Sequence, residues 1–434
     1  MPPQFELQGE AVPLHSEYEP LGRVIVHEPG YEWNLVTVEH DMPEKYLIED
    51  VLFTERAAAD HREFTDCLRH AAGPDAVLKF TDLLADVLAE REVRSDVVGA
   101  ISALEGVGIG THDYLLSDSL PAKELARLLV AGAYRPDDPD HRGYRVFFPP
   151  IPNLLFTRDL GMFFDNAVIL SHPAKPIRRR EGLLARYIFR NHPQFEGIEI
   201  IDVLDDATVH GLAGNVHLEG GDVIVLDAET VLVGSSERTT DAAIQLLARR
   251  LFADGRARRL IKVLMPRDRA TMHLDTVFTI IGRDDCVYYP PFFSEEKGNT
   301  PLNCVTYEMV DGELTVVDQS APRGLFAALE RIGCHFPNRI PCGGHIPHYQ
   351  TREQWTDGAN LFAARPQVAF IYERNMQTIE SFDQAGYSVL TPAEYLKADP
   401  SGNSRTLVTL SGAELSRGRG GARCMTMPVV RSSA

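Results

Sequence analysis

The chain has few of the features that mark several common protein classes. Its six cysteines lie far apart without a CxxC pair, too sparse for a disulfide scaffold in 434 residues. No stretch approaches the roughly 18 consecutive apolar residues of a membrane span, and the N-terminal segment lacks the basic and apolar regions of a secretory signal. We therefore expect reduced thiols in a cytoplasmic, non-membrane protein.

Basic residues are also in deficit. The chain has 43 Lys and Arg against 62 Asp and Glu, so its formal net charge is −19, which argues against a nucleic-acid-binding protein. With 44% hydrophobic residues, 33 Gly and 28 Pro, the composition is that of a globular protein and excludes disordered or collagen-like chains. The length permits two or three average domains, or one large fold with an insertion.

Strand and helix patterns recur in a similar order along the chain. Together with an N-terminal set, they give about five strand–strand–helix–strand units, in which NLLFTRD (153–159) and HLDTVFTII (273–281) are among the expected strands. In residues 240–252, four apolar positions spaced i, i+3, i+4 and i+7 predict a helix with one buried face. Such recurrence favours a quasi-symmetric closed array of strands around an axis, with an open doubly wound sheet as the alternative. Residues 85–144 show helix patterns only.

Four short patterns place polar or reactive residues at strand ends or in glycine-rich turns. They are Phe156-Thr-Arg-Asp159, Glu219-Gly-Gly-Asp222, His273-Leu-Asp275 and Arg417-Gly-Arg-Gly-Gly-Ala-Arg-Cys424. On a strand, His273 and Asp275 would point to the same face. The glycines of the second pattern permit a tight turn or close approach of the backbone to another group. Taken singly, each of the first three patterns is more often structural than functional.

The cysteine of the fourth pattern has arginines close to it in the sequence. Arg419 and Arg423 create a positive potential that favours the thiolate of Cys424, which is the nucleophilic form of the side chain. A buried, inert cysteine is the alternative for this segment on its own. The acidic net charge disfavours reading its glycines and arginines as a nucleic-acid-binding segment.

Two further patterns suggest sites that we do not expect to form. Cys342, His345 and His348 offer possible zinc ligands, but no fourth ligand follows at metal-site spacing. The glycines at 106, 108 and 110 lack the preceding strand of a dinucleotide-binding turn.

In their order along the chain, FTRD, EGGD, HLD and RGRGGARCM resemble the arginine deiminase family of the guanidine-modifying (amidinotransferase) superfamily. Arg352-Glu-Gln-Trp-Thr-Asp-Gly-Ala-Asn360 and Tyr372-Glu-Arg-Asn375 also lie in family order, so the resemblance covers most of the chain. It implies an α/β fold, a five-bladed α/β propeller formed by residues 1–84 and 145–434, with residues 85–144 as an all-helical insertion domain.

The resemblance implies hydrolysis of L-arginine to L-citrulline and ammonia, without a metal or organic cofactor, by a homo-oligomer that is a dimer or larger. Cys424 matches the family's nucleophile and would form a covalent amidino (thiouronium) intermediate. His273, oriented and charged by Glu219, would act first as a general acid and then as a general base. Asp159 and Asp275 match the carboxylates that bind the planar guanidinium cation.

The amino-acid end of the substrate needs contacts of its own. Arg178, Arg238 and Arg419 match the family's carboxylate-binding arginines. The remaining substrate contacts that we expect are Asn153, Phe156 and Asp222.

The chain departs from the family pattern at two positions. His345 stands where Asp or Thr is typical, and Ile379 stands where Asn is typical. They leave open an alternative, an amidinotransferase or a deiminase that acts on another small guanidino compound. A catalytically silent binding protein is disfavoured by the intact set of cysteine, histidine and acids.

Overall fold

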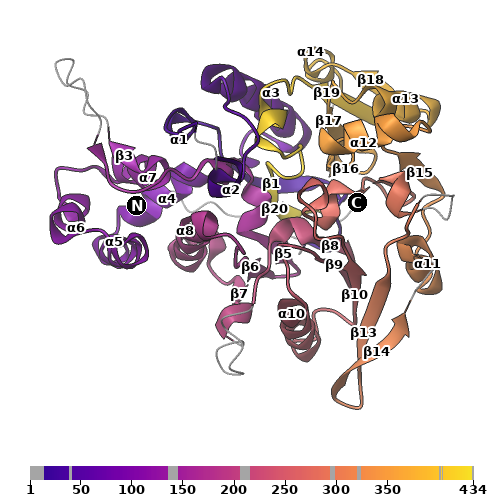
Figure 1. Cartoon of the computed structure of the whole chain (residues 1–434), viewed down its shortest axis with the longest axis horizontal. Coiled ribbons are helices and arrows are strands. Elements are labelled where there is room, and N and C mark those ends of the chain that lie inside the picture. The colour runs from indigo at the N-terminus through magenta and orange to yellow at the C-terminus, as the bar shows by residue number, and fades with distance from the viewer. Residues whose placement is uncertain are drawn as a thin grey trace.

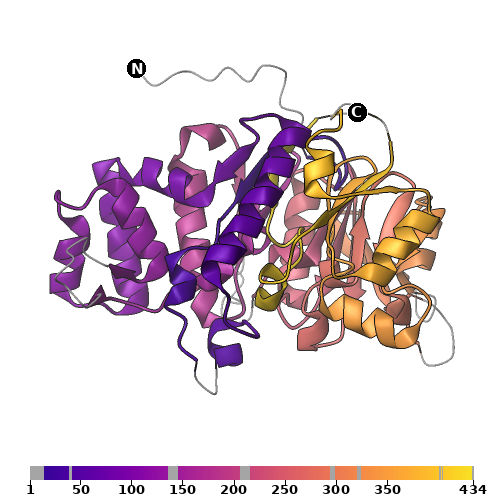
Figure 2. The ribbon, with the colours of Figure 1, turned by 90° about the horizontal axis from the view of Figure 1, so that it is seen from above.

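The computed structural model describes residues 14–38, 42–134, 145–205, 216–293, 299–319, 324–399, 402 and 404–432. The architecture is mixed α/β, with helices α4 to α7 gathered at one end of the molecule and the sheets, with the other helices, forming the rest (Figure 1 and Figure 2). No described helix is both long and apolar enough to cross a membrane.

The described strands form five mixed sheets and one two-stranded ladder. Each mixed sheet contains an antiparallel pair. The pairs are β5 (Gly161–Phe164) with β6 (Ala167–Leu170), β8 (Val223–Asp227) with β9 (Thr230–Ser235), β11 (Phe278–Ile280) with β12 (Asp285–Tyr288), β16 (Phe362–Arg365) with β17 (Val368–Tyr372), and β20 (Met427–Arg431) with β1 (Leu21–Val26).

In every mixed sheet, the second strand of the pair also has a parallel neighbour. In the same order, these neighbours are β7 (Glu199–Ile201), β10 (Arg259–Leu264), β15 (Asn338–Pro341), β19 (Thr406–Leu410) and β2 (Val77–Lys79). A parallel neighbour requires a crossover connection, and each connection contains a helix. The helices are α8 (Arg179–Asn191), α10 (Asp241–Ala253), α11 (Gly324–Arg331), α13 (Met376–Gln384) and α3 (Thr54–Ala72).

Five strand–strand–helix–strand units are therefore present in the described part of the chain. Their strands form separate sheets, so the alternative of one open, doubly wound sheet is wrong. The other elements extend the units or connect them. They are β13 (Cys304–Val310), β14 (Glu313–Gln319), β18 (Ser388–Leu390), α1 (Tyr31–Asn34), α2 (Met42–Tyr46), α12 (Pro347–Trp355) and α14 (Pro392–Tyr395).

Helix α10 shows how local sequence determines an element. The hydroxyl of Thr240 accepts a hydrogen bond from the N–H of Ala243 and caps the first turn. The predicted stripe is buried, and Ile244, Leu247 and Leu251 have no exposed surface. Each such side chain contributes about 1.5–3 kcal/mol when it leaves water, so the helix is held mainly by its apolar face.

The helical end of the molecule comprises α4 (Phe80–Leu88), α5 (Arg91–Glu105), α6 (Ile109–Leu116) and α7 (Ala122–Ala131). It also contains a short ladder of β3 (Ala133–Tyr134) and β4 (Arg145–Val146), which the sequence patterns did not predict. Leu84, Val98 and Leu129 of these helices share one hydrophobic cluster with Leu184 of α8 and Phe163 of β5. The helices are thus packed against the nearest unit by a continuous core.

The predicted strand at 153–159 is wrong, and the predicted strand at 273–281 is shorter than expected, because only β11 (Phe278–Ile280) forms within it. Residues 152–160 form two 3₁₀ turns, η1 (Pro152–Leu155) and η2 (Thr157–Leu160), and His273 precedes a third, η8 (Leu274–Thr276). The N–H of Leu274 donates to Oδ1 of Asp222 (3.0 Å), and the Thr276 hydroxyl donates to the carbonyl of His273 (2.6 Å). The bond within residues 273–276 is local and closes the turn, whereas the bond to Asp222 attaches the turn to the preceding unit.

Candidate active site

The polar residues of the sequence motifs lie on turns at one recurring place in the fold. In each unit, a turn directly precedes the first strand of the antiparallel pair, and it carries polar or reactive side chains. These side chains are Asp159 before β5, Glu219 and Asp222 before β8, His273 and Asp275 before β11, Asp357 and Asn360 before β16, and Cys424 before β20. The five units therefore each supply part of one site.

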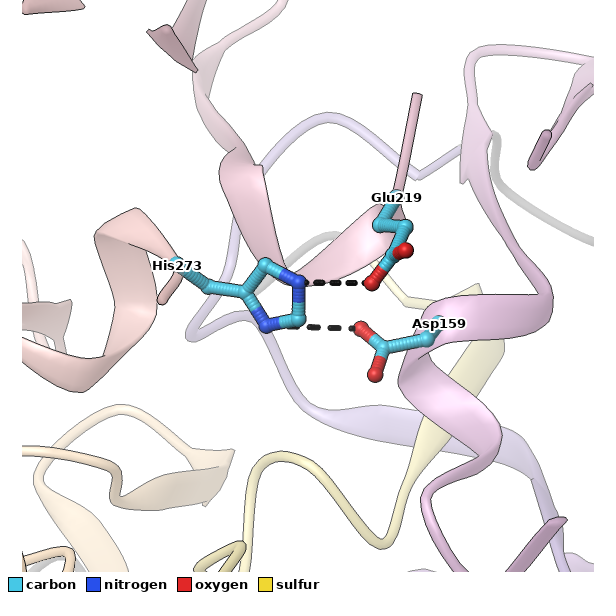
Figure 3. Close-up of side chains that lie close together, drawn as sticks. All are labelled: Asp159, Glu219 and His273. Atoms are coloured by element: carbon cyan, nitrogen blue, oxygen red, sulfur yellow. Dashed lines mark hydrogen bonds and ion pairs between the residues drawn. The ribbon is translucent and has the colours of Figure 1, made fainter. Parts of the chain in front are cut away.

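His273 is held between two carboxylates (Figure 3). Its Nε2 lies 2.9 Å from Oε2 of Glu219, and its Nδ1 lies 3.7 Å from Oδ1 of Asp159. Burial alone would lower the pKa of His273, but Asp159 and the hydrogen bond to Glu219 outweigh burial and raise this pKa to about 9. His273 is therefore a cation at neutral pH.

Glu219 stays ionised despite complete burial. Burial alone would raise its pKa, but the guanidinium of Arg238, 3.4 Å away, and the bond to His273 hold the pKa well below its usual range. The N–H of Ala174 donates to its other carboxylate oxygen, Oε1. A fixed anion is thereby kept beside the imidazole.

The glycines next to Glu219 are required by this arrangement. A Cβ on Gly221 would lie 2.6 Å from Nδ1 of His273 and 3.0 Å from Oδ1 of Asp159, and the N–H of Gly221 donates to that same oxygen (3.1 Å). A Cβ on Gly220 would lie 2.1 Å from the carbonyl of Arg158. The tight turn that the glycines permit is present, and it lies against groups of the protein itself.

The backbone on both sides of the Cys424 side chain is fixed by neighbouring units. Its N–H donates to Oδ1 of Asn360 (3.0 Å), and its carbonyl accepts from the N–H of Arg158 (3.0 Å). The side chain is buried, with its Sγ 3.9 Å from Oδ2 of Asp275. Cys424 is thus positioned beside one of the two expected guanidinium-binding carboxylates.

The prediction that nearby arginines favour the Cys424 thiolate is wrong for this structure. Burial raises the pKa of the thiol well above its ordinary value, and the carboxylates of Asp275, Asp159 and Asp357 raise it further. The guanidinium of Arg423 is hydrogen-bonded to Oδ2 of Asp275 (2.7 Å) and acts on that carboxylate. Sequence proximity did not show the direction of this side chain.

Asp275 belongs to a buried network of charges. Arg423 bridges it to Glu17, which lies 2.9 Å from the other end of the guanidinium, and Arg158 lies 3.9 Å from Glu17. Burial raises the pKa of Asp275, while Arg423 opposes this increase. Its Oδ1 has no hydrogen-bond partner in the described structure. One carboxylate oxygen is therefore fixed by the protein and the other remains unsatisfied.

The motif residues enclose a small cavity of about 20 Å³, room for roughly one water molecule. Its lining includes most of the predicted site. The lining residues are Leu47, Asn153, Phe156, Asp159, Arg178, Arg238, Met272, His273, Thr276, Asp357, Arg419 and Cys424.

The three predicted carboxylate-binding arginines all reach this cavity, but with different partners. Arg178 lies 2.5 Å from Oδ2 of Asp159 and 2.8 Å from Oε2 of Glu181. Arg238 contacts Glu219, and its buried Nε has no partner in the described structure. Arg419 donates to three backbone carbonyls and stacks on the ring of Trp355 at 3.7 Å.

Other predicted positions lie away from the cavity. Asp222 is fully buried and bonds to Ser236 (2.6 Å) and to the turn before β11, so it does not line the cavity. His345 is exposed, and Ile379 packs in a neighbouring hydrophobic cluster. Neither departure from the family pattern touches the cavity.

The structure does not bring the possible zinc ligands together. Cys342 is buried, whereas His345 and His348 are exposed. Among the described residues, the group with ligand atoms within 4.8 Å of one another is Asp159, Glu219 and His273. Cys342, His345 and His348 are not part of that group.

Sequence reasoning missed the contributions of the fourth unit, Asp357 and Asn360. Both fall in the segment REQWTDGAN, which supports the family resemblance by its place in the chain but to which no site residue was assigned. The recurrence of the units contained the missing signal, because this segment precedes the first strand of its unit as the other motifs do.

A model of the arginine deiminase family matches residues 44–431. The chain belongs to the arginine deiminase family. Arginine deiminases of Listeria monocytogenes serotype 4b (strain CLIP80459) and serovar 1/2a (strain ATCC BAA-679 / EGD-e) are each 30% identical to it over 440 residues, covering 98% of both chains. Members of this family are hydrolases that act on a guanidino C–N bond. The resemblance inferred from the four motifs is confirmed.

Solved structures with a similar fold are arginine-processing or guanidino-transferring enzymes. The N-terminal domain of ArgZ, solved with a covalent reaction intermediate, has a TM-score of 0.51 at 13% identity and covers 94% of this chain and 98% of its own. SxtG, an amidinotransferase from Microseira wollei, has a TM-score of 0.51 at 14% identity with 98% coverage of both chains. At these identities the likeness concerns the fold alone.

Proposed function

We propose that this protein hydrolyses L-arginine to L-citrulline and ammonia by covalent catalysis at Cys424. The observation that carries the proposal is the convergence on one cavity of the Cys424 thiol, the cationic His273 and the carboxylate of Asp159, with the carboxylate of Asp275 3.9 Å from the thiol. Each of these groups has a task in the hydrolysis of a guanidinium.

Asp159 and Asp275 would hold the substrate guanidinium with its central carbon over Cys424. The bound cation would also offset the carboxylates that raise the pKa of Cys424, so that the thiol releases its proton to the solvent and the thiolate forms in the complex. The thiolate then attacks the central carbon, and the adduct expels one amino group. Because His273 is protonated at neutral pH, it supplies the proton with which this group leaves as ammonia.

The second half of the reaction reverses the role of the histidine. Neutral His273 takes a proton from water, and the hydroxide adds to the carbon of the thiouronium intermediate. The C–S bond then breaks, which returns the Cys424 thiolate and releases citrulline. Glu219, 2.9 Å from the imidazole, stabilises the cation that forms at the end of this step.

The substrate carboxylate would pair with Arg238, Arg419 and Arg178. A cavity of about 20 Å³ is too small for arginine, so lining side chains must move when it enters. The contact between Arg178 and Asp159 is the one that a substrate guanidinium would have to replace. Asn153 and Phe156, which also line the cavity, would complete the pocket.

We further infer that the five units are arranged as the blades of an α/β propeller, with residues 85–144 as the helical insertion between residues 1–84 and 145–434. The common position of the motif turns supports this arrangement, because a shared axis is the simplest way to bring five equivalent turns to one cavity. A homo-oligomer, a dimer or larger, remains our expectation from the family resemblance.

The test is to incubate the purified protein with L-arginine alone and with added glycine as an amine acceptor. We expect equal amounts of citrulline and ammonia in both cases. The rate of citrulline formation should fall at least about a thousandfold in Cys424→Ser, because a hydroxyl ionises far less readily than a thiol. The control variant Cys334→Ser should form citrulline at the normal rate. Ornithine and guanidinoacetate in place of citrulline and ammonia would show an amidinotransferase instead.

A further inference from the structure

Asp357 is a buried carboxylate that the mechanism above does not use. It lies in the turn between α12 and β16, is 4% exposed, and lines the cavity together with Cys424 and Arg419. Its Oδ2 has no hydrogen-bond partner in the described structure. A buried carboxylate without a partner is costly, so its retention at this place calls for a ligand.

The nearest cations are engaged elsewhere. Arg419 donates to the backbone carbonyls of Trp355, Arg269 and Ala270, and Arg374 donates to the hydroxyl of Ser416 at 2.5 Å. Both attract the carboxylate only at longer range. Burial therefore dominates and raises the pKa of Asp357 to about 7.

The turn that carries Asp357 is held firmly. A Cβ on the next residue, Gly358, would lie 2.8 Å from the carbonyl of Glu353 and 3.0 Å from Sγ of Cys342. The carboxylate of Glu353 accepts from the N–H groups that begin α13, including that of Thr378 at 2.8 Å. Asp357 itself has a positive φ of 63°, which Asp and Asn tolerate better than other side chains. Its direction is thus set by the fold.

The charges of the substrate and the cavity can be matched group by group. Zwitterionic L-arginine carries a guanidinium, a carboxylate and an α-ammonium. In the proposed mechanism, Asp159 and Asp275 pair with the guanidinium, and the arginines pair with the carboxylate. The α-ammonium is then left without a counter-ion. Among the residues that line the cavity, Asp357 is the remaining carboxylate.

We propose that Asp357 binds the α-ammonium group of the substrate amino acid and so determines specificity at the end of the substrate remote from the reaction. This inference rests on the proposed function and deepens it. An ammonium facing Asp357 would satisfy the unpartnered oxygen and keep the carboxylate ionised. The residue is then a specificity contact in the fourth unit, on the same kind of turn that supplies the reacting groups from the other units.

Three substrates separate the contacts at this end. L-arginine has both the α-ammonium and the carboxylate, 5-guanidinopentanoate lacks the ammonium, and agmatine lacks the carboxylate. We expect the full-length wild-type protein to prefer arginine over 5-guanidinopentanoate by at least about tenfold in kcat/KM, because that analogue leaves Asp357 unpaired. In Asp357→Asn the ratio of kcat/KM for arginine to that for 5-guanidinopentanoate should fall below about threefold. The lower kcat/KM for arginine should come from a higher KM, with kcat little changed.

Agmatine and Arg238→Ala provide the matched controls. Agmatine retains the ammonium, so Asp357→Asn should lower kcat/KM for agmatine about as much as it lowers kcat/KM for arginine. Arg238→Ala should instead reduce the difference in kcat/KM between arginine and agmatine. In Arg238→Ala the preference for arginine over 5-guanidinopentanoate should stay as in the wild-type protein. Asn fits the positive φ and the volume of Asp, and an unchanged melting temperature verifies the fold.

Two results would overturn the assignment. If Asp357→Asn lowers kcat/KM equally for all three substrates, Asp357 is a structural or reacting group. If Asp357→Asn instead reduces the difference in kcat/KM between arginine and agmatine, Asp357 acts by positioning Arg419. Failure of the wild-type protein to release citrulline from arginine would instead remove the proposed function itself.

Discussion

At the scale of single residues, the site is organised by groups that alter each other's ionisation. The free protein has a neutral thiol at Cys424 and a cationic imidazole at His273. Both follow from the same buried carboxylates, since anions disfavour a thiolate and favour an imidazolium. The reacting groups are thus in the protonation states that suit an attack triggered by a bound cation.

Alkylation of Cys424 tests the state of the thiol. Because burial and carboxylates raise its pKa well above the ordinary value, we expect slow reaction with iodoacetamide at pH 7 in the absence of substrate. The rate should rise about tenfold per pH unit through pH 9, as the thiolate fraction grows. Peptide mass spectrometry measures the rate of alkylation at Cys424. If this rate is the same at pH 7 and pH 9, the thiolate is already stabilised in the free protein.

The bond between Glu219 and His273 makes a prediction about pH. Activity needs protonated His273, so it should fall as pH rises through about 9. Glu219→Gln removes the neighbouring anion and lowers the pKa of the imidazole, which moves this alkaline limb to lower pH. The measurement is kcat/KM against pH for both proteins, because kcat/KM reports the ionisation of the free enzyme. An alkaline limb at the same pH in the variant would contradict the role assigned to Glu219.

At the scale of elements, the turns before the strands decide the geometry. A Cβ on Gly421 would lie 2.5 Å from the carbonyl of Asn360, whereas one on Gly110 in α6 would meet nothing within 4 Å. We expect Gly421→Ala to displace the turn that carries Cys424 and to lower kcat/KM at least about a hundredfold, since small misplacements of reacting groups are costly. Gly110→Ala is the control.

The two variants differ in the space around the new methyl group. Gly110→Ala should keep full activity and gain up to about 1 kcal/mol of stability, because Ala is the better helix former. Circular dichroism melts and arginine turnover measure both effects. Full activity in Gly421→Ala would show that the turn can shift without cost to the site.

Sequence patterns predicted the regular elements better than the turns. The stripe on α10 and the recurrence of the units depend on periodic burial, which can be read along the chain. The turn at His273 depends on a bond from Leu274 to Asp222, which lies in the preceding unit. Such a contact between segments far apart in sequence leaves no local signal, so a strand was predicted there.

The candidate site was predictable to the extent that its motifs are specific. The motifs placed Cys424, His273 and Asp159 on one cavity, and the structure brings them together. The direction of Arg423 and the role of Asp357 could not be read in the same way. Both depend on contacts between side chains of different units, and the sequence does not show the distances between these side chains.

At the scale of the whole molecule, five units each contribute residues to one cavity. The reaction is assigned to Cys424 because its side chain is the one nucleophilic thiol on that cavity among the described residues. In the proposed mechanism, the surrounding units supply the acid, the base and the counter-ions. The central claim is therefore that the guanidino carbon of arginine becomes bonded to Cys424 during turnover.

Acid quenching during the first turnover, followed by mass spectrometry of the intact protein and its peptides, tests this claim most directly. We predict a transient mass increase equal to arginine less one ammonia, located on the peptide that contains Cys424 and decaying as citrulline appears. Formation of citrulline while Cys424 remains unmodified at every quench time, or an adduct on another residue, would contradict the account.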